Sequence, residues 1–193
     1  LKLAKIRKDI NENIYDDNIK NLIQIPKAIK ESLNSENEVQ LIAKEFLNAK
    51  GSMFLGRGSS FPIALEGALK LKELSYLHAE GYPAGEMKHG PLALIEEGLP
   101  VIVIAPKDKY FAKTLSNMQE VIARGGKIIF ITDNKKLIAS DNIRFGLRVP
   151  FLNNLLSPIL LTAPLQLLAY HVALLKNCDI DKPRNLAKSV TVE

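Results

Sequence analysis

Residues 53–77, MFLGRGSSFPIALEGALKLKELSYL, join a short apolar run to a long helical pattern through a glycine-rich loop. The apolar residues 53–55 are typical of a buried strand, and the two glycines that follow allow a tight turn. Ser59 and Ser60 suit the cap of a helix. We therefore predict a strand, a short loop and a helix over residues 61–77, which is the repeating unit of α/β domains.

The same alternation of strand and helix patterns continues along the chain. Short apolar runs separated by amphipathic stretches predict a parallel sheet with helices on both faces. We predict an α/β fold of three layers, α/β/α, with a parallel sheet of about five strands, preceded by a pair of helices. The predicted strands are 53–55, 101–105, 128–132 and 143–149, with a weaker one at 78–82 that Gly81 interrupts, and the predicted helices are 21–33, 36–50, 61–77, 110–124 and 158–176.

Length and composition favour one domain with an appendage. A chain of 193 residues, 47% of them apolar, can bury one good core. We predict this domain at residues 21–176, a linker at residues 1–20 and a tail at residues 177–193. Because the chain begins without Met, we expect a fragment or a processed chain, with residues 1–20 leading from a missing upstream domain.

The charge and the cysteine content exclude several classes of protein. The chain has 26 basic and 21 acidic residues, a net charge of +5, and no basic stripe interleaved with aromatic residues. We therefore expect no nucleic-acid partner. Cys178 is the single cysteine, which excludes an internal disulfide and a zinc site built on cysteines. We expect a passive thiol, no metal or cofactor, and a reducing, cytoplasmic compartment.

No segment has the composition of a signal peptide or a membrane span. The longest apolar stretch, residues 155–175, is interrupted by Ser, Pro, Thr, Gln and His, and falls short of about 20 uninterrupted apolar residues. The first ten residues carry charge but are not followed by the apolar core of a signal peptide. We predict a buried helix at residues 158–176 and no membrane association.

One helix carries a narrow polar stripe. At 100° per residue, Glu66, Lys70 and Glu73 lie within about 60° of one another, and apolar residues occupy most of the remaining circumference. A helix that is apolar nearly all round is a buried helix, so these three groups face a partner, a cleft or each other. The alternative is an intrahelical pair of Glu66 and Lys70 with Glu73 in solvent.

The loop GYPAGEMKHGPLALI at residues 81–95 contains His89, the best-placed histidine for chemistry. A histidine on a glycine-rich loop can reach a substrate and titrates near neutral pH, as a general acid or base must. The alternative is an ordinary surface histidine. His78 and His171 have weaker claims, because each lies in or beside an apolar element and is interpreted as a hydrogen-bonded core residue.

Two further segments admit a functional interpretation. Free amides in the loop that contains Ser59 and Ser60 are suited to hold a phosphate at the start of the helix, although a well-capped turn explains the same residues. The last ten residues, RNLAKSVTVE, are richer in apolar and β-branched residues than a frayed terminus usually is. We expect this tail to dock on the domain.

Two long motifs carry a family resemblance. GRGSSFPIALEGALKLKELSYLHAEGYPAGEMKHGPLALI (residues 56–95) and PLQLLAYHVALLKNCDIDKPRNLAKSVTVE (residues 164–193) resemble the C-terminal half of the isomerase region of the glutamine:fructose-6-phosphate aminotransferase family. The resemblance runs from about residue 20 to the last residue. It implies a second sugar isomerase (SIS) domain with its C-terminal tail, and implies that a glutaminase domain and a first SIS domain are missing.

The resemblance also implies roles for four residues. Glu73 matches the base that moves a proton between C1 and C2 of fructose 6-phosphate, and Lys70 matches the neighbouring lysine that stabilises the intermediate. His89 matches the histidine that assists ring opening in the site of a neighbouring subunit, which implies a homodimer. Lys188 matches the tail lysine that forms a Schiff base with the sugar, and its apolar neighbours are suited to lower the pKa of its amine.

The departures from the family pattern define the alternatives. The family's phosphate-binding serines and threonines belong mainly to the first SIS domain, so Ser59 and Ser60 are only candidate phosphate-binding residues here. We therefore expect this chain alone to be inactive as the enzyme that makes glucosamine 6-phosphate from fructose 6-phosphate and glutamine. The alternatives are a stand-alone sugar-phosphate isomerase, and a non-catalytic SIS module that binds a sugar phosphate.

Overall fold

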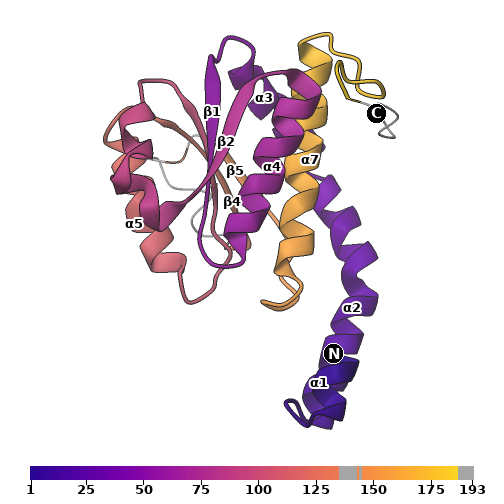
Figure 1. The fold of residues 1–193 in the computed structure, drawn as a ribbon. Helices are drawn as coiled ribbons and strands as arrows, with labels where there is room; N and C mark the ends of the chain where they lie inside the picture. The colour runs from indigo at the N-terminus through magenta and orange to yellow at the C-terminus, as the bar shows by residue number, and fades with distance from the viewer. Residues whose placement is uncertain (135–142, 144, 187–193) are drawn as a thin grey trace, which may run out of the picture.

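A parallel sheet lies at the centre of the computed structural model, which describes residues 1–134, 143 and 145–186 (Figure 1). Its five strands lie side by side in the order β2-β1-β3-β4-β5. Parallel pairing and strand number confirm the prediction, including the strand at 78–82 that rested on a weak pattern. The strands are β1 (Gly51–Gly56), β2 (His78–Pro83), β3 (Pro100–Ile104), β4 (Lys127–Thr132) and β5 (Phe145–Arg148).

Helices cover both faces of the sheet, which gives the predicted three layers (Figure 1). One face packs against α3 (Glu36–Ala43), α4 (Ser60–Ser75) and α7 (Ser157–Leu175). The other packs against α5 (Phe111–Ile122) and the 3-10 helix η2 (Ala84–His89). Short 3-10 helices η1 (Lys44–Phe46) and η3 (Pro91–Leu94) complete the domain.

The two cores follow from alternation along each strand. In β3, Ile102 and Ile104 belong to the core under α4 and α7, whereas Val101 and Val103 belong to the core under α5. All five residues of β3 are buried, as expected of a central parallel strand with helices on both faces. This is why β3 reads in the sequence as a continuous apolar run.

Two glycines allow α4 to lie close to the sheet. A Cβ at Gly56 would lie 2.2 Å from the carbonyl oxygen of Ser60, so the turn between β1 and α4 requires glycine. A Cβ at Gly81 would lie 2.9 Å from the backbone nitrogen of Leu65. Gly81, which weakened the prediction of β2, is therefore the residue that lets α4 pack directly on this edge strand.

Helix α7 is the one element of the described residues that is long and apolar enough to cross a membrane, judged by length and composition alone. Half of that stretch is buried in the domain, against α4, α3 and α2 (Glu12–Leu33). The arrangement agrees with the predicted buried helix that closes one face of the sheet.

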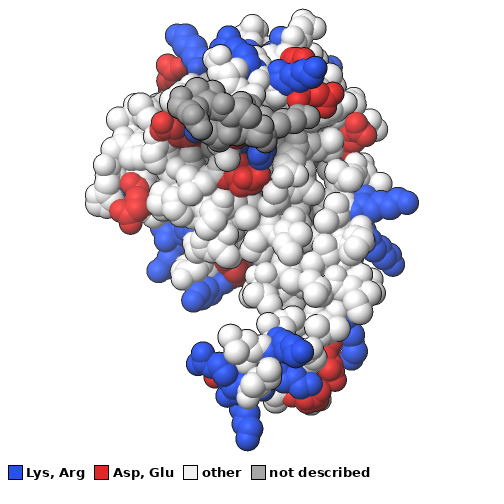
Figure 2. Space-filling view, turned by 45° about the vertical axis from the view of Figure 1, so that its right-hand side comes forward, with Lys and Arg blue, Asp and Glu red and all other residues white. Residues whose placement is uncertain are grey.

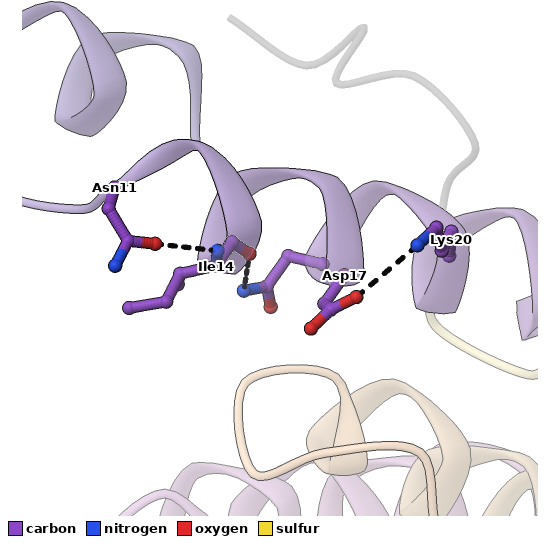
Figure 3. A network of polar contacts seen from close by, with 5 residues as sticks. Asn11, Ile14, Asp17 and Lys20 are labelled. Atoms are coloured by element: carbon purple, nitrogen blue, oxygen red, sulfur yellow. Dashed lines mark hydrogen bonds and ion pairs between the residues drawn. The ribbon is translucent and has the colours of Figure 1, made fainter.

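The N-terminal segment is more helical than the apolar spacing predicts, since the helix expected at residues 21–33 begins at Glu12. The expected linker at residues 1–20 is largely helical, because α1 (Lys2–Ile6) and the first turns of α2 occupy it. The side chain of Asn11 caps α2 by accepting a hydrogen bond of 2.9 Å from the backbone of Ile14, and Asp17 pairs with Lys20 at 3.5 Å (Figure 3). Local polar contacts, which apolar spacing does not register, extend the helix toward the N-terminus.

Helix α2 projects away from the sheet (Figure 1) and buries only Ile25, Ala28 and Ser32. Acidic and basic side chains lie together at its far end (Figure 2), where Arg7 pairs with Asp9 at 3.1 Å and Lys5 pairs with Glu12. Carboxylates therefore compensate part of the basic cluster in the first eight residues.

Candidate active site

Helix α4 carries the predicted polar stripe along the outer face of the domain. It buries Ala64, Ala68 and Leu71 against the sheet and α7. The prediction that α4 is buried nearly all round is wrong for this chain, since Leu65 and Leu69 are 44% and 40% exposed. The stripe borders this exposed apolar surface.

Lys70 and Glu73 form an ion pair on the stripe. Lys70 Nζ lies 2.9 Å from Glu73 Oε2, and the two side chains are 33% and 27% exposed. The hydrogen bond to Glu73 raises the pKa of Lys70 above its ordinary value, so this lysine stays cationic at neutral pH. Glu66 instead contacts Gln166 Nε2 at 3.5 Å. Lys70 is therefore paired with Glu73. The alternative arrangement, in which Lys70 pairs with Glu66 and Glu73 lies in solvent, is not the one observed.

Glu73 faces a cavity of about 530 Å³ at the C-terminal end of α4. One wall belongs to α4 and the start of β2, and the other belongs to the beginning of the C-terminal tail. The lining residues are Leu69, Lys72, Glu73, Tyr76, Leu77, His78, Arg184, Asn185 and Leu186. Segments more than 100 residues apart in the sequence therefore border the open cavity that Glu73 faces.

The described part of the tail ends at this cavity. The backbone N–H of Arg184 donates a hydrogen bond of 2.9 Å to Tyr76 Oη, and the Arg184 guanidinium lies 4.1 Å from the centre of the Tyr76 ring. Figure 1 shows the tail beside the upper ends of α4 and α7. Lys188 lies outside the described residues, two positions beyond Leu186. Neither Tyr76 nor Arg184 was a predicted site residue, and no local pattern in the sequence pairs them.

His89 lies at the opposite end of the sheet from Glu73. β1 pairs with β2 so that Gly51 is beside His78 and Gly56 is beside Pro83. Glu73 precedes the amino end of β2, whereas His89 follows its carboxyl end, with a side chain 76% exposed. The structure therefore does not bring these two predicted residues together within one chain.

A second cavity, of about 480 Å³, lies at the carboxyl ends of the strands. Ser59 lines it together with Gly58, Asp108, Lys109 and other residues, in the crevice where α/β sheets commonly bind ligands. The Ser59 side chain makes no capping bond, and Ser60 Oγ is buried without a hydrogen-bond partner among the described residues. The candidate phosphate loop is thus about 20 Å from Glu73, since 13 helical residues separate them.

Of the other two histidines, His171 has a structural role and His78 does not. His171 is buried in α7 and its Nε2 lies 3.1 Å from Glu36 Oε1, as predicted for a hydrogen-bonded core histidine. His78 differs from that prediction, because its side chain is 77% exposed and lines the cavity beside Glu73. Cys178 is a free thiol. Within residues 1–134, 143 and 145–186, no group of three or more His, Cys, Asp or Glu side chains is arranged to hold a metal.

Comparisons with known proteins agree with this architecture. A family model described as SIS domain matches residues 45–176. The chain is 52% identical over 194 residues to glutamine–fructose-6-phosphate aminotransferase (isomerizing) of Bartonella henselae. The matched region covers 100% of this chain and 32% of that protein. It is 54% identical over 177 residues to the protein of the same name from Agrobacterium fabrum, and this matched region covers 91% of this chain and 29% of that protein.

The fold leads to the same group. The C-terminal domain of glucosamine-fructose-6-phosphate aminotransferase from Francisella tularensis superimposes with a TM-score of 0.88 at 42% identity, covering 93% of this chain and 51% of that one. The chain spans about a third of the length of the curated relatives it matches. It belongs to the SIS domain family and is homologous to the C-terminal SIS region of glutamine–fructose-6-phosphate aminotransferases.

Proposed function

We propose that this chain supplies part of the isomerisation site of an enzyme that makes glucosamine 6-phosphate and glutamate from fructose 6-phosphate and glutamine. The observation that carries the proposal is the Lys70–Glu73 pair beside a cavity that the C-terminal tail lines on its other side. A carboxylate and a cation at one surface cavity suit a proton transfer next to a sugar carbonyl.

Glu73 acts as the base in this proposal. Its carboxylate removes a proton from the carbon beside the carbonyl and returns it to the former carbonyl carbon, while the hydroxyl proton of the first carbon passes to the former carbonyl oxygen, which converts a ketose to an aldose framework. Negative charge develops on the carbonyl oxygen during the transfer, and Lys70 stabilises it electrostatically. The raised pKa of Lys70 suits this role, because the lysine is then charged throughout the neutral range.

The rest of the site comes from other parts of the protein. Lys188, four residues after Arg184, forms the Schiff base with the sugar carbonyl, and His89 assists ring opening in the site of a second copy of this chain. The separation of His89 and Glu73 within one chain favours a homodimer over a site built by a single copy.

The distance between Glu73 and the loop with Ser59 and Ser60 favours a phosphate site on another domain. We therefore place the phosphate-binding groups in a first SIS domain of the same protein, and the source of ammonia in a glutaminase domain. The protein is cytoplasmic in this proposal.

The test is Glu73→Gln in the full-length protein that contains this chain. Glutamine keeps the shape of glutamate but accepts no proton, so the rate of proton exchange at the sugar carbon in D₂O should fall by about 10²-fold or more. Binding of fructose 6-phosphate should remain measurable. Glu66→Gln, on the same helix but outside the cavity, is the matched control and should change the rate by less than about twofold. Unchanged exchange in Glu73→Gln would overturn the assignment of the base.

A further inference from the structure

Tyr76 occupies an unusual backbone conformation at the end of α4. It is the residue that follows the last turn of the helix, with φ of +59°, and its N–H bonds to the carbonyl of Lys72 at 3.1 Å. Glycine or asparagine usually takes this left-handed position, because a bulky side chain is strained there. Asn177 and Asn185, which flank the start of the tail, have the same sign of φ and are residues that tolerate it. A tyrosine that keeps such a conformation indicates a function for its side chain.

The side chain of Tyr76 contacts the tail in two ways. Its hydroxyl accepts the backbone N–H of Arg184 at 2.9 Å, and its ring faces the Arg184 guanidinium at 4.1 Å. The chain turns immediately afterwards at Asn185, with φ of +61°. A hydrogen bond and a cation–π contact therefore hold the same tail residue by its backbone and by its side chain.

We propose that Tyr76 and Arg184 form a latch that positions the C-terminal tail beside Glu73. Both are positioning residues, which act on the sugar through Lys188 and Glu73. The proposal rests on the proposed function, in which the tail lysine and Glu73 act on one substrate. Tyr76 follows Glu73 by three residues, so the Tyr76 side chain holds the tail backbone from the end of the helix that carries the base.

The number of residues between Lys188 and the nearest fixed residue sets how much activity the loss of the latch should cost. With the latch closed, Lys188 is four residues from a fixed point at Arg184. Without it, the nearest backbone hydrogen bond to the domain is the one that the N–H of Cys178 donates to the carbonyl of Ala173, and Cys178 is 10 residues away from Lys188. The reach of a flexible segment grows with the square root of its length, so the volume open to the side chain at position 188 grows about fourfold. Its effective concentration at the sugar falls by the same factor.

The experiment compares variants of the full-length protein. Tyr76→Asn suits the left-handed backbone and removes the ring, and Tyr76→Phe removes only the hydroxyl. Each is measured for trypsin cleavage after Arg184 and for kcat/KM with fructose 6-phosphate. We expect Tyr76→Asn to be cleaved faster and to lose about fourfold in kcat/KM at an unchanged Tm, with smaller effects in Tyr76→Phe. Arg124→Ala removes an exposed arginine far from the tail and is the matched control for Arg184→Ala.

The outcomes separate the latch from the proposed function. Faster cleavage together with lower kcat/KM in Tyr76→Asn supports the latch. A kcat/KM that is lower in Arg184→Ala and partly recovered in Arg184→Lys supports the cation–π contact. Faster cleavage in a protein that has no isomerase activity even without substitutions would support the latch and overturn the proposed function. Cleavage and kcat/KM that are the same in Tyr76→Asn as in the unsubstituted protein would overturn the latch.

Discussion

Substitution of Gly81 by alanine tests the contact that places α4, and with it Glu73, against the sheet. Gly81 lies in the edge strand β2 beside Phe54 of β1. An added Cβ would lie 2.9 Å from the nitrogen of Leu65 and 3.0 Å from the carbonyl oxygen of Ala64. Both atoms belong to the backbone of α4, so no side-chain rotation relieves the contact.

The magnitude follows from these distances. Non-bonded heavy atoms are most stable at about 3.5–4 Å, so α4 must move away by about 0.5–1 Å. Overpacking of this kind costs about 1–3 kcal/mol, and the lower entropy of the unfolded alanine chain offsets about 0.4–1 kcal/mol. We expect Gly81→Ala to lower the free energy of unfolding by about 1–2 kcal/mol, which is about 2–8 °C in Tm for a chain of this size.

Urea unfolding of the two variants Gly81→Ala and Gly51→Ala provides the comparison. Gly51 also lies in the sheet, but its added Cβ would approach the carbonyl of His78 only to 3.3 Å. We expect Gly51→Ala to lose less than about 1 kcal/mol, with the same denaturant slope for both. If Gly81→Ala is as stable as the unsubstituted chain, α4 is not held in backbone contact with β2 and the reasoning is wrong.

Two further predictions concern the helix α2 and an alkaline titration. Asn11→Ala removes the cap of α2 and should destabilise its first turn by about 1 kcal/mol, seen as faster hydrogen exchange of the Ile14 amide. Unchanged exchange would mean that the cap does not form. The hydrogen bond to Glu80 raises the pKa of Tyr82 to about 12. Because the unfolded value is about 10, this stabilisation is complete below pH 10 and is lost as the pH rises to about 12. The stability of Tyr82→Phe should therefore fall less over this range, and an identical slope in both proteins would refute the shift.

Local patterns in the sequence were sufficient for much of the fold. The continuous apolar run of β3 predicts a buried central strand, and the alternation of such runs with amphipathic stretches predicts a parallel sheet between two helical layers. The stripe of Glu66, Lys70 and Glu73 follows from helical periodicity alone. These features depend on residues within one or two turns of each other, so the printed sequence contains the whole signal.

The start of α2 shows where such patterns stop. Residues 12–20 have little apolar periodicity, and a side-chain cap at Asn11 sets the beginning of the helix. Gly81 is a second example. Glycine weakened the prediction of β2, yet its missing side chain is what allows α4 to pack on this strand. In both cases the deciding contact is polar or steric, and hydrophobic spacing does not record it.

The sequence by itself determined the element types, the polar stripe and, through two long motifs, the family. Only the tertiary structure decided how the candidate residues are arranged. It places Glu73 before the amino end of β2 and His89 after its carboxyl end. It also brings Arg184 into contact with Tyr76, 108 positions away in the chain. Periodicity describes which face of an element a side chain occupies, whereas the meeting of distant segments depends on strand order and on the path of the tail. These are set by the packing of the whole domain, because no short stretch of sequence specifies its distant partner.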